Sequence, residues 1–206
     1  MSGLFITMEG TDGSGKSTQL NLLSQYLEKK GFNIVFVREP GGTKIGEKIR
    51  DIILDINNKK MDYMTETFLY ASSRSQLVNE IIAPELKKGS IVICDRFVDS
   101  SIVYQGIARN IGIDVVKKIN NIATGGLTPD ITFFLDLSPQ EAIKRKIQQK
   151  ELDRLESEKD YFYKKVYDGY KLLISQNSER IKVIDATQSI ENIHKNIVNY
   201  IESIFF

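Results

Sequence analysis

Five short apolar runs recur along the chain, separated by longer segments in which apolar residues follow a helical period. The runs are rich in β-branched and aromatic residues, which favour strands. These predicted strands lie at 4–8, 34–37, 91–94, 131–135 and 181–184. The segments between and after them predict helices near 16–29, 44–54, 65–88, 113–123, 139–149, 158–176 and 189–204. The pattern is therefore an alternation of strands and helices.

Continuously apolar strands are typical of a parallel sheet that is covered by helices on both faces. We therefore expect an α/β fold with a five-stranded parallel sheet. No internal repeat, proline-rich linker or low-complexity tract divides the chain, so we expect one domain over residues 1–206. Because such sheets bind ligands at the carboxyl ends of their strands, functional residues should follow the strands directly.

The strongest motif follows the first predicted strand. Residues 10–17, Gly-Thr-Asp-Gly-Ser-Gly-Lys-Ser, match the pattern G-x-x-x-x-G-K-[ST] of a phosphate-binding loop and open a helix. The glycines let backbone N–H groups converge on phosphate oxygens, Lys16 reaches the outer phosphates and Ser17 ligates Mg²⁺. The residues predicted to bind ATP with this Mg²⁺ are Gly10, Thr11, Asp12, Gly13, Ser14, Gly15, Lys16, Ser17 and Thr18.

Further anion sites separate the possible classes of P-loop protein. A GTPase switch needs N-K-x-D to bind guanine, whereas residues 58–61 are Asn-Lys-Lys-Met. A motor-type ATPase stays possible from the loop alone. Arg38 and Arg96 close or follow the second and third strands, where two guanidinium groups would suit a monophosphate. Surface salt bridges are the alternative for this pair. A carboxylate inside the loop opposes phosphate, so Asp12 is expected to face a second substrate.

Several motifs in order along the chain resemble those of the thymidylate kinase family. They are the P-loop with its internal acid, Arg-Glu-Pro-Gly-Gly at 38–42, Phe68 followed by Arg74, Asp95-Arg96, Ser101, Tyr-Gln-Gly at 104–106 and Pro-Asp at 129–130. The resemblance runs nearly end to end. It implies the nucleoside monophosphate kinase fold and transfer of the γ-phosphoryl of ATP to dTMP, giving dTDP and ADP for dTTP biosynthesis. The alternatives are a kinase for another nucleoside monophosphate and a non-catalytic nucleotide-binding regulator.

The resemblance also implies how the acceptor is bound. The residues that it assigns to the acceptor are Arg38, Phe68, Arg74, Arg96, Ser101, Tyr104 and Gln105. Phe68 would stack on the thymine ring, although its position alone is more typical of a core residue. Arg74 and Gln105 would form hydrogen bonds with the edge of the base. Tyr104 would crowd the sugar where a ribose hydroxyl would lie.

The same resemblance implies which charged residues act in phosphoryl transfer. Arg38 and Arg96 would bind the acceptor phosphate, Asp12 would face the acceptor sugar and Arg38, and Asp95 would orient Mg²⁺ through water. The residues expected to act in catalysis are Lys16, Arg96, Asp12, Arg38, Lys150 and Arg154.

The segment 144–156 resembles the mobile lid of these kinases. It carries the basic residues Lys144, Arg145, Lys146, Lys150 and Arg154, whereas the P-loop contains no arginine. This is the pattern of the bacterial subclass, in which a basic lid residue folds over the triphosphate. Lys150 and Arg154 are the candidates for that residue, and Arg145 is expected beside the adenine. A charged helix face is the alternative.

Composition limits the partners. Lys and Arg number 28 against 27 Asp and Glu, so the chain lacks the bulk positive charge of a protein that binds nucleic acid or a membrane surface. The N-terminus has no basic segment followed by a long apolar stretch, and we expect a cytoplasmic protein. The resemblance adds the expectation of a homodimer.

Overall fold

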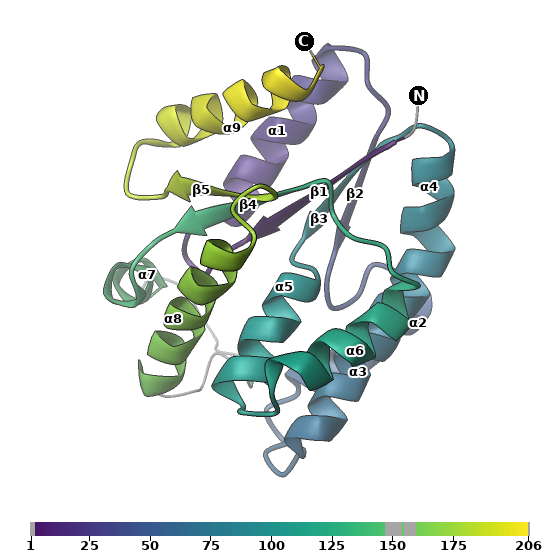
Figure 1. The fold of residues 1–206 in the computed structure, drawn as a ribbon, viewed down its shortest axis with the longest axis vertical. Helices are drawn as coiled ribbons and strands as arrows, with labels where there is room; N and C mark the ends of the chain where they lie inside the picture. Colours follow the sequence, from purple (N-terminus) through teal and green to yellow (C-terminus); the bar gives the residue numbers. More distant parts are fainter. Residues whose placement is uncertain (1–2, 147–153, 155–159, 206) are drawn as a thin grey trace.

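The structure is a computed structural model that describes residues 3–146, 154 and 160–205. Five parallel strands form a sheet in the order β2-β3-β1-β4-β5, as Figure 1 shows. The strands are β1 (Leu4–Glu9), β2 (Ile34–Arg38), β3 (Ile91–Asp95), β4 (Ile131–Asp136) and β5 (Ile181–Asp185). The predicted five-stranded parallel sheet is confirmed. Each strand begins at the predicted residue and extends one residue further, ending on a charged side chain.

The register brings these charged strand ends to one edge of the sheet. Arg38 of β2 pairs with Asp95 of β3, and Met8 of β1 pairs with the same Asp95. On the other side of β1, Asp136 of β4 pairs with Asp185 of β5. The loops that follow the strands therefore leave the sheet together, which is the arrangement that lets them share a ligand.

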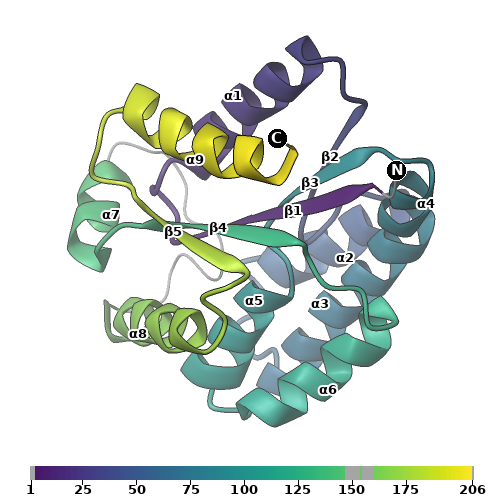
Figure 2. The same cartoon turned by 45° about the horizontal axis from the view of Figure 1, so that its top comes forward.

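One face of the sheet is covered by α1 (Lys16–Lys29) and α9 (Ile190–Phe205), which lie together above the sheet in Figure 2. Both helices carry apolar residues at a spacing of three or four, which places them on one face of the helix. The residues buried against the sheet from these helices are Leu20, Leu23, Leu27, Ile193, Ile197 and Ile201. This packing fixes the start of α1 directly after the phosphate-binding loop.

The opposite face is covered by the other helices except α7, whose Ala142 packs in the same cluster as α1 and α9 (Figure 2). Directly over the sheet lie α3, η1, α4, α5, η2 and α8, while α2 and α6 pack against α3, and α6 also packs against η2. Their bounds, with the short helix α7, are α2 (Lys44–Leu54), α3 (Tyr63–Leu77), η1 (Val78–Ile82), α4 (Ala83–Lys87), α5 (Val98–Ser101), η2 (Ile102–Ala108), α6 (Ile113–Thr124), α7 (Pro139–Lys146) and α8 (Asp160–Gln176). In the described ranges no helix is both long and apolar enough to cross a membrane.

Two helical regions differ from the prediction. The helix expected over 65–88 is a continuous helical run in which a π-helical segment, η1, separates α3 from α4. The helical run 98–108, formed by α5 and η2, was not predicted. Its serines, β-branched residues and Gly106 have low helix propensity, and nearly every residue of η2 is buried, so no amphipathic period is present.

Candidate active site

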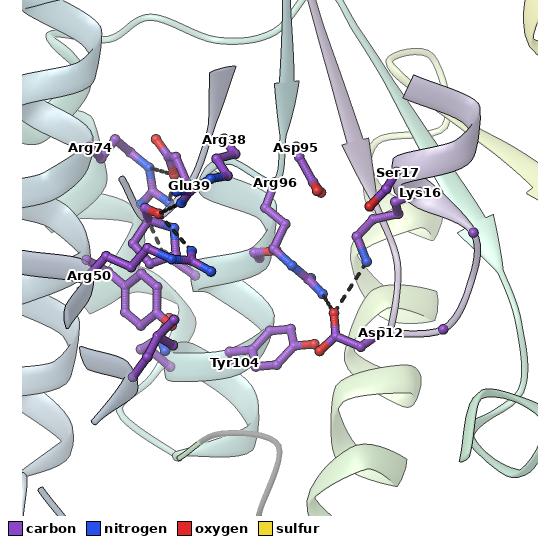
Figure 3. A pocket seen from close by; sticks show the side chains of 18 of the residues that line it. Asp12, Lys16, Ser17, Arg38, Glu39, Arg50, Arg74, Asp95, Arg96 and Tyr104 are labelled. Carbon is purple, nitrogen blue, oxygen red and sulfur yellow. Dashed lines mark hydrogen bonds and ion pairs between the residues drawn. The ribbon is translucent and has the colours of Figure 1, made fainter. Parts of the chain in front are cut away.

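A pocket of about 450 Å³ lies at the carboxyl edge of the sheet. Its wall is formed by the P-loop, the ends of β2 and β3, and residues of α2, α3, α5, η2, α7 and α8. Figure 3 shows the labelled side chains converging on it. Of the residues that the structure describes, the cationic ones lining it are Lys16, Arg38, Arg50, Arg74, Arg96 and Arg145, and the acidic ones are Asp12, Glu39 and Asp95. The excess of positive charge suits anionic ligands.

The P-loop has the backbone that phosphate binding requires. Gly10, Gly13 and Gly15 all have positive φ, at 144°, 84° and 93°. A Cβ on Gly13 would lie 2.9 Å from the carbonyl oxygen of Ala142, so a side chain would collide with backbone there. Gly15 precedes the first residue of α1 and gives it no side-chain cap. The first N–H groups of the helix are therefore available to an anion.

Lys16 and Arg96 both reach Asp12, as the dashed lines in Figure 3 show. Lys16 Nζ lies 3.6 Å from Asp12 Oδ1 and donates to the carbonyl oxygens of Gly10 and Thr11, each at 3.1 Å. Arg96 Nη2 donates to the same Asp12 oxygen at 2.6 Å. Burial lowers the pKa of Lys16 and the Arg96 charge lowers it further, while Asp12 opposes both effects.

Arg96 itself stands in a left-handed backbone conformation, with φ of 66°. Such a conformation is unfavourable for a residue with a Cβ and is found often at functional sites. Glu9, a buried residue that the sequence analysis did not single out, stabilises the turn that follows. It accepts hydrogen bonds from the Phe97 N–H at 2.8 Å and from the Ser100 hydroxyl at 2.6 Å. Burial raises the pKa of Glu9.

Arg38 lines the pocket as predicted, from the end of β2. Its guanidinium donates to the Pro40 carbonyl oxygen at 2.9 Å and to both carboxylate oxygens of Glu47 at 2.9 and 3.0 Å. The expectation that Asp12 faces Arg38 is wrong in this structure, because Glu47 pairs with Arg38 and Arg96 pairs with Asp12. Arg50, which the sequence analysis missed, also donates to the Pro40 carbonyl oxygen.

Arg74 lines the pocket, and its side chain is buried. Its five N–H groups all have acceptors: two reach Glu39, and the others reach Asn120, Ser101 Oγ at 3.0 Å and the Phe97 carbonyl oxygen at 3.1 Å. Because Ser101 accepts from Arg74, its hydroxyl hydrogen can donate to a ligand. Burial raises the pKa of Glu39 to about 7, and Arg74 opposes this shift.

The structure contradicts the predicted position of Phe68. This side chain is 54% exposed and does not line the pocket, whereas Tyr70 does. Both belong to α3, where residues four apart share a face and residues six apart do not. Tyr70 is four residues before Arg74, and Phe68 is six before it. Tyr70 is therefore the aromatic residue that faces the pocket beside Arg74.

Three other predicted acceptor residues line the pocket, and they come from the helical run that the sequence did not predict. They are Ser101, Tyr104 and Gln105. The Tyr104 hydroxyl is buried and has no hydrogen-bond partner among the described residues. Burial raises its pKa to about 12. The Arg96 guanidinium lies 5.5 Å from the centre of the Tyr104 ring, so the two residues define one wall together.

The predictions for the basic residues of the lid differ in how they compare with the structure. Arg145 lines the pocket and donates to the Ala186 carbonyl oxygen at 3.0 Å. Lys150 lies outside the described residues, as does most of 144–156 beyond residue 146. Arg154 does not line the pocket: it donates to Glu66 at 2.6 Å and to the Ile53 carbonyl oxygen at 2.7 Å. The buried carboxylate of Glu66 attracts this guanidinium away from the P-loop, contrary to the expectation.

Ser17 and Asp95, the predicted metal residues, both line the pocket. Asp95 Oδ1 is buried, and no described residue donates a hydrogen bond to it. An unpaired buried carboxylate oxygen facing the P-loop fits a cation or its bound water. Mg²⁺ is commonly bound by one or two protein oxygens together with substrate phosphates, so a larger acidic cluster is not required.

Comparison with known proteins agrees with this geometry. The family described as thymidylate kinase matches residues 8–197. Thymidylate kinase from Thermoanaerobacter sp. (strain X514) is 52% identical over 202 residues, covering 98% of each chain. Thymidylate kinase from Exiguobacterium sp. (strain ATCC BAA-1283 / AT1b) is 49% identical, covering 97% of this chain and 94% of its own. The crystal structure of thymidylate kinase from Ehrlichia chaffeensis superposes with a TM-score of 0.81 at 32% identity, covering 98% of this chain and 100% of its own. The chain belongs to the thymidylate kinase family.

Proposed function

We propose that the protein transfers the γ-phosphoryl group of ATP to dTMP, giving dTDP and ADP. The observation that carries this proposal is the presence of two groups of cations in one pocket. Lys16 lies on the P-loop side, and Arg38 lies at the end of β2, with Arg96 between them in Figure 3. Two anion-binding groups that face each other suit a donor triphosphate and an acceptor monophosphate.

Catalysis in such a site consists of positioning and charge neutralisation. Lys16 binds the transferring phosphoryl group, and Arg96 binds the acceptor phosphate close to it. The acceptor oxygen is already anionic, so no general base is needed. Ser17 and Asp95 would hold Mg²⁺, which supplies further neutralisation of the phosphate charge when it is bound. Lys150 remains a candidate for the lid cation.

The experiment that tests the proposed function is ADP formation from Mg-ATP with a panel of nucleoside monophosphates, with direct detection of the diphosphate product. We expect strong preference for dTMP. Preference for another acceptor would retain the phosphate sites and contradict the assignment of the base. Absence of turnover with every acceptor, together with ATP binding, would favour the nucleotide-binding regulator.

Replacing Tyr70 by alanine should raise the KM for dTMP by roughly 5- to 100-fold, because stacking of a base on an aromatic ring contributes about 1–3 kcal/mol. The side chain lines the pocket one helical turn before Arg74, where a flat base can lie against it. The KM for ATP should change little. Steady-state kinetics with each substrate varied in turn measures both values.

Phe68→Ala is the matched control on the same helix. Because Phe68 lies outside the pocket, this variant should keep the parent KM for dTMP. A larger rise in the KM for dTMP from Phe68→Ala than from Tyr70→Ala would show that Phe68, and not Tyr70, stacks on the base. Conversion of Tyr70 to Phe should retain most of the affinity, since the ring is conserved.

We also propose that two copies associate through the outer face of α2, α3 and α6. The helices α2 and α6 both pack against α3, and exposed apolar side chains lie on all three: Ile45, Ile52, Phe68 and Ile122. Such residues on neighbouring helices are typical of an interface between proteins. Light scattering should give twice the mass of one chain, and Ile122→Asp should reduce it to one. A wild-type monomer would contradict this assignment.

Three further predictions from the sequence stay predictions. They are a single domain over 1–206 with a lid at 144–156, a cytoplasmic location, and the lack of a nucleic-acid or membrane partner. The nearly equal numbers of acidic and basic residues support the third of these predictions. Localisation of a tagged protein would test the second.

A further inference from the structure

Glu66 is a buried carboxylate on α3 with three partners. It has no exposed surface, and its two oxygens accept hydrogen bonds from three side chains. Gln105 Nε2 donates to Oε1 at 2.9 Å, and Arg109 Nε donates to the same oxygen at 3.4 Å. Arg154 Nη2 donates to Oε2 at 2.6 Å. The two guanidinium groups compensate the negative charge, which makes burial of this carboxylate tolerable.

This contact determines the orientation of the Gln105 side-chain amide. A carboxylate only accepts hydrogen bonds, so the amide nitrogen of Gln105 must face Glu66. The amide oxygen then lies on the other side of the amide carbon. Gln105 lines the pocket, and within the described residues nothing donates to its oxygen. Gln105 therefore offers an acceptor to a ligand.

Rotation of the amide by half a turn is costly in this position. It would bring the Gln105 oxygen against the Glu66 carboxylate, and both are acceptors. Gln105 is 2% exposed, so water cannot replace the lost hydrogen bond easily. An unpaired polar group in such a buried place is disfavoured, because it has lost its hydrogen bonds to water and gained none from the protein.

An acceptor at this place distinguishes the pyrimidine bases. The ring nitrogen N3 of thymine and uracil carries a hydrogen and donates, whereas N3 of cytosine has a lone pair and accepts. A fixed Gln105 oxygen therefore accepts a hydrogen bond from N3 of thymine or uracil. It repels N3 of cytosine, because both atoms are acceptors. We propose that Glu66 is a specificity-determining residue, which excludes cytosine nucleotides by fixing the Gln105 amide. This inference rests on the proposed function, because it takes Gln105 as the residue that contacts the base edge.

Glu66→Gln tests the inference, since an amide at position 66 can donate as well as accept and lets Gln105 turn either way. The quantity to measure is the ratio of kcat/KM for dTMP to kcat/KM for dCMP. This ratio should fall by at least about tenfold, because a site built to pair a polar group discriminates strongly only while its orientation is fixed. A general loss of structure would lower both values and leave the ratio unchanged.

Two controls distinguish an effect on the orientation of the Gln105 amide from a general loosening of the buried cluster around Glu66. Arg109→Lys weakens the same buried cluster without removing the acceptor of Gln105, so it should keep the parent ratio. In a Gln105→Ala background, Glu66→Gln should have no further effect on the ratio. An equal fall of the ratio in Arg109→Lys, or a full effect of Glu66→Gln without Gln105, would overturn the inference.

A measurement on the wild-type protein covers the case in which Glu66→Gln does not fold. The NMR signals of the Gln105 side-chain NH₂ group, assigned by their loss in Gln105→Ala, should show slow hydrogen exchange with and without dTMP. Rapid exchange without ligand that slows on dTMP binding would show that the nitrogen faces the base, and would overturn the inference. A wild-type preference for an acceptor other than dTMP contradicts the proposed function as well. Preference for dTMP in the wild-type protein, with an unchanged ratio in a folded Glu66→Gln variant, contradicts the role of Glu66 alone.

Discussion

Replacement of Lys16 by methionine should lower kcat roughly 1000-fold, because removal of one preorganised charge from a phosphoryl-transfer site costs this order of magnitude. Methionine keeps the length and apolar volume of the lysine stem, so the buried environment stays filled. Asp12 keeps its hydrogen bond to Arg96 in the variant. Turnover at saturating ATP and dTMP measures the effect, and equilibrium binding of ATP shows how much of it comes from weaker affinity.

Lys29→Met is the control for the Lys16 variant. Lys29 lies in the last turn of the same helix, is exposed and is far from the P-loop end of α1. Its replacement should leave kcat unchanged. A Lys16→Met enzyme that retains more than a tenth of the parent turnover would show that another cation neutralises the transferring phosphoryl group.

Arg96→Gly should lower kcat/KM for dTMP by about 100- to 1000-fold, because the variant lacks the guanidinium next to the acceptor phosphate. Arg96 has φ of 66°, a conformation that glycine adopts without strain. The loss of activity should therefore come without a loss of backbone stability. Binding of ATP should weaken far less than binding of dTMP.

Arg96→Ala provides the comparison for this variant. Alanine removes the same guanidinium but keeps the Cβ, so it should lose activity equally and melt at a lower temperature than Arg96→Gly. Kinetics of the two variants measure the effect of losing the guanidinium. Their thermal unfolding measures the effect of the Cβ on the stability of the backbone conformation. Equal weakening of ATP and dTMP would mean that Arg96 serves both substrates rather than the acceptor.

The sheet and the phosphate-binding loop could be predicted because their signals are local. A run of apolar β-branched residues predicts a strand by itself, and the glycine and lysine spacing of 10–17 is readable without tertiary structure. The parallel register then brings Arg38 and Asp95 to the same edge, as expected from the topology alone. The strands and the phosphate-binding loop could therefore be predicted without knowledge of long-range contacts.

The choice between Phe68 and Tyr70 could have been made from the sequence. Helical periodicity places Tyr70, and not Phe68, on the same face as Arg74, whereas the family resemblance alone had assigned the stacking role to Phe68. The tyrosine, one helical turn before Arg74, carries the same stacking surface.

The partners of Glu66 and Arg154 could not be predicted from the sequence. They come from distant parts of the chain, and their contact depends on how α3 packs against its neighbours. A charged residue in a helix is exposed in most cases, so burial of Glu66 is visible only when its guanidinium partners are placed. The helical run 98–108 could not be predicted either, because tertiary packing overrides its poor helix propensity.

The carboxylate of Asp12, which Lys16 and Arg96 share, has a consequence for how phosphate binding depends on salt. It acts as an internal counter-ion between Lys16 and Arg96, so the two cations are partly neutralised before any substrate arrives. A phosphate that binds between Lys16 and Arg96 therefore meets cations whose charge Asp12 has already reduced. Ions from solution have less charge to screen in such a site, and affinity for the nucleotide should depend only weakly on ionic strength.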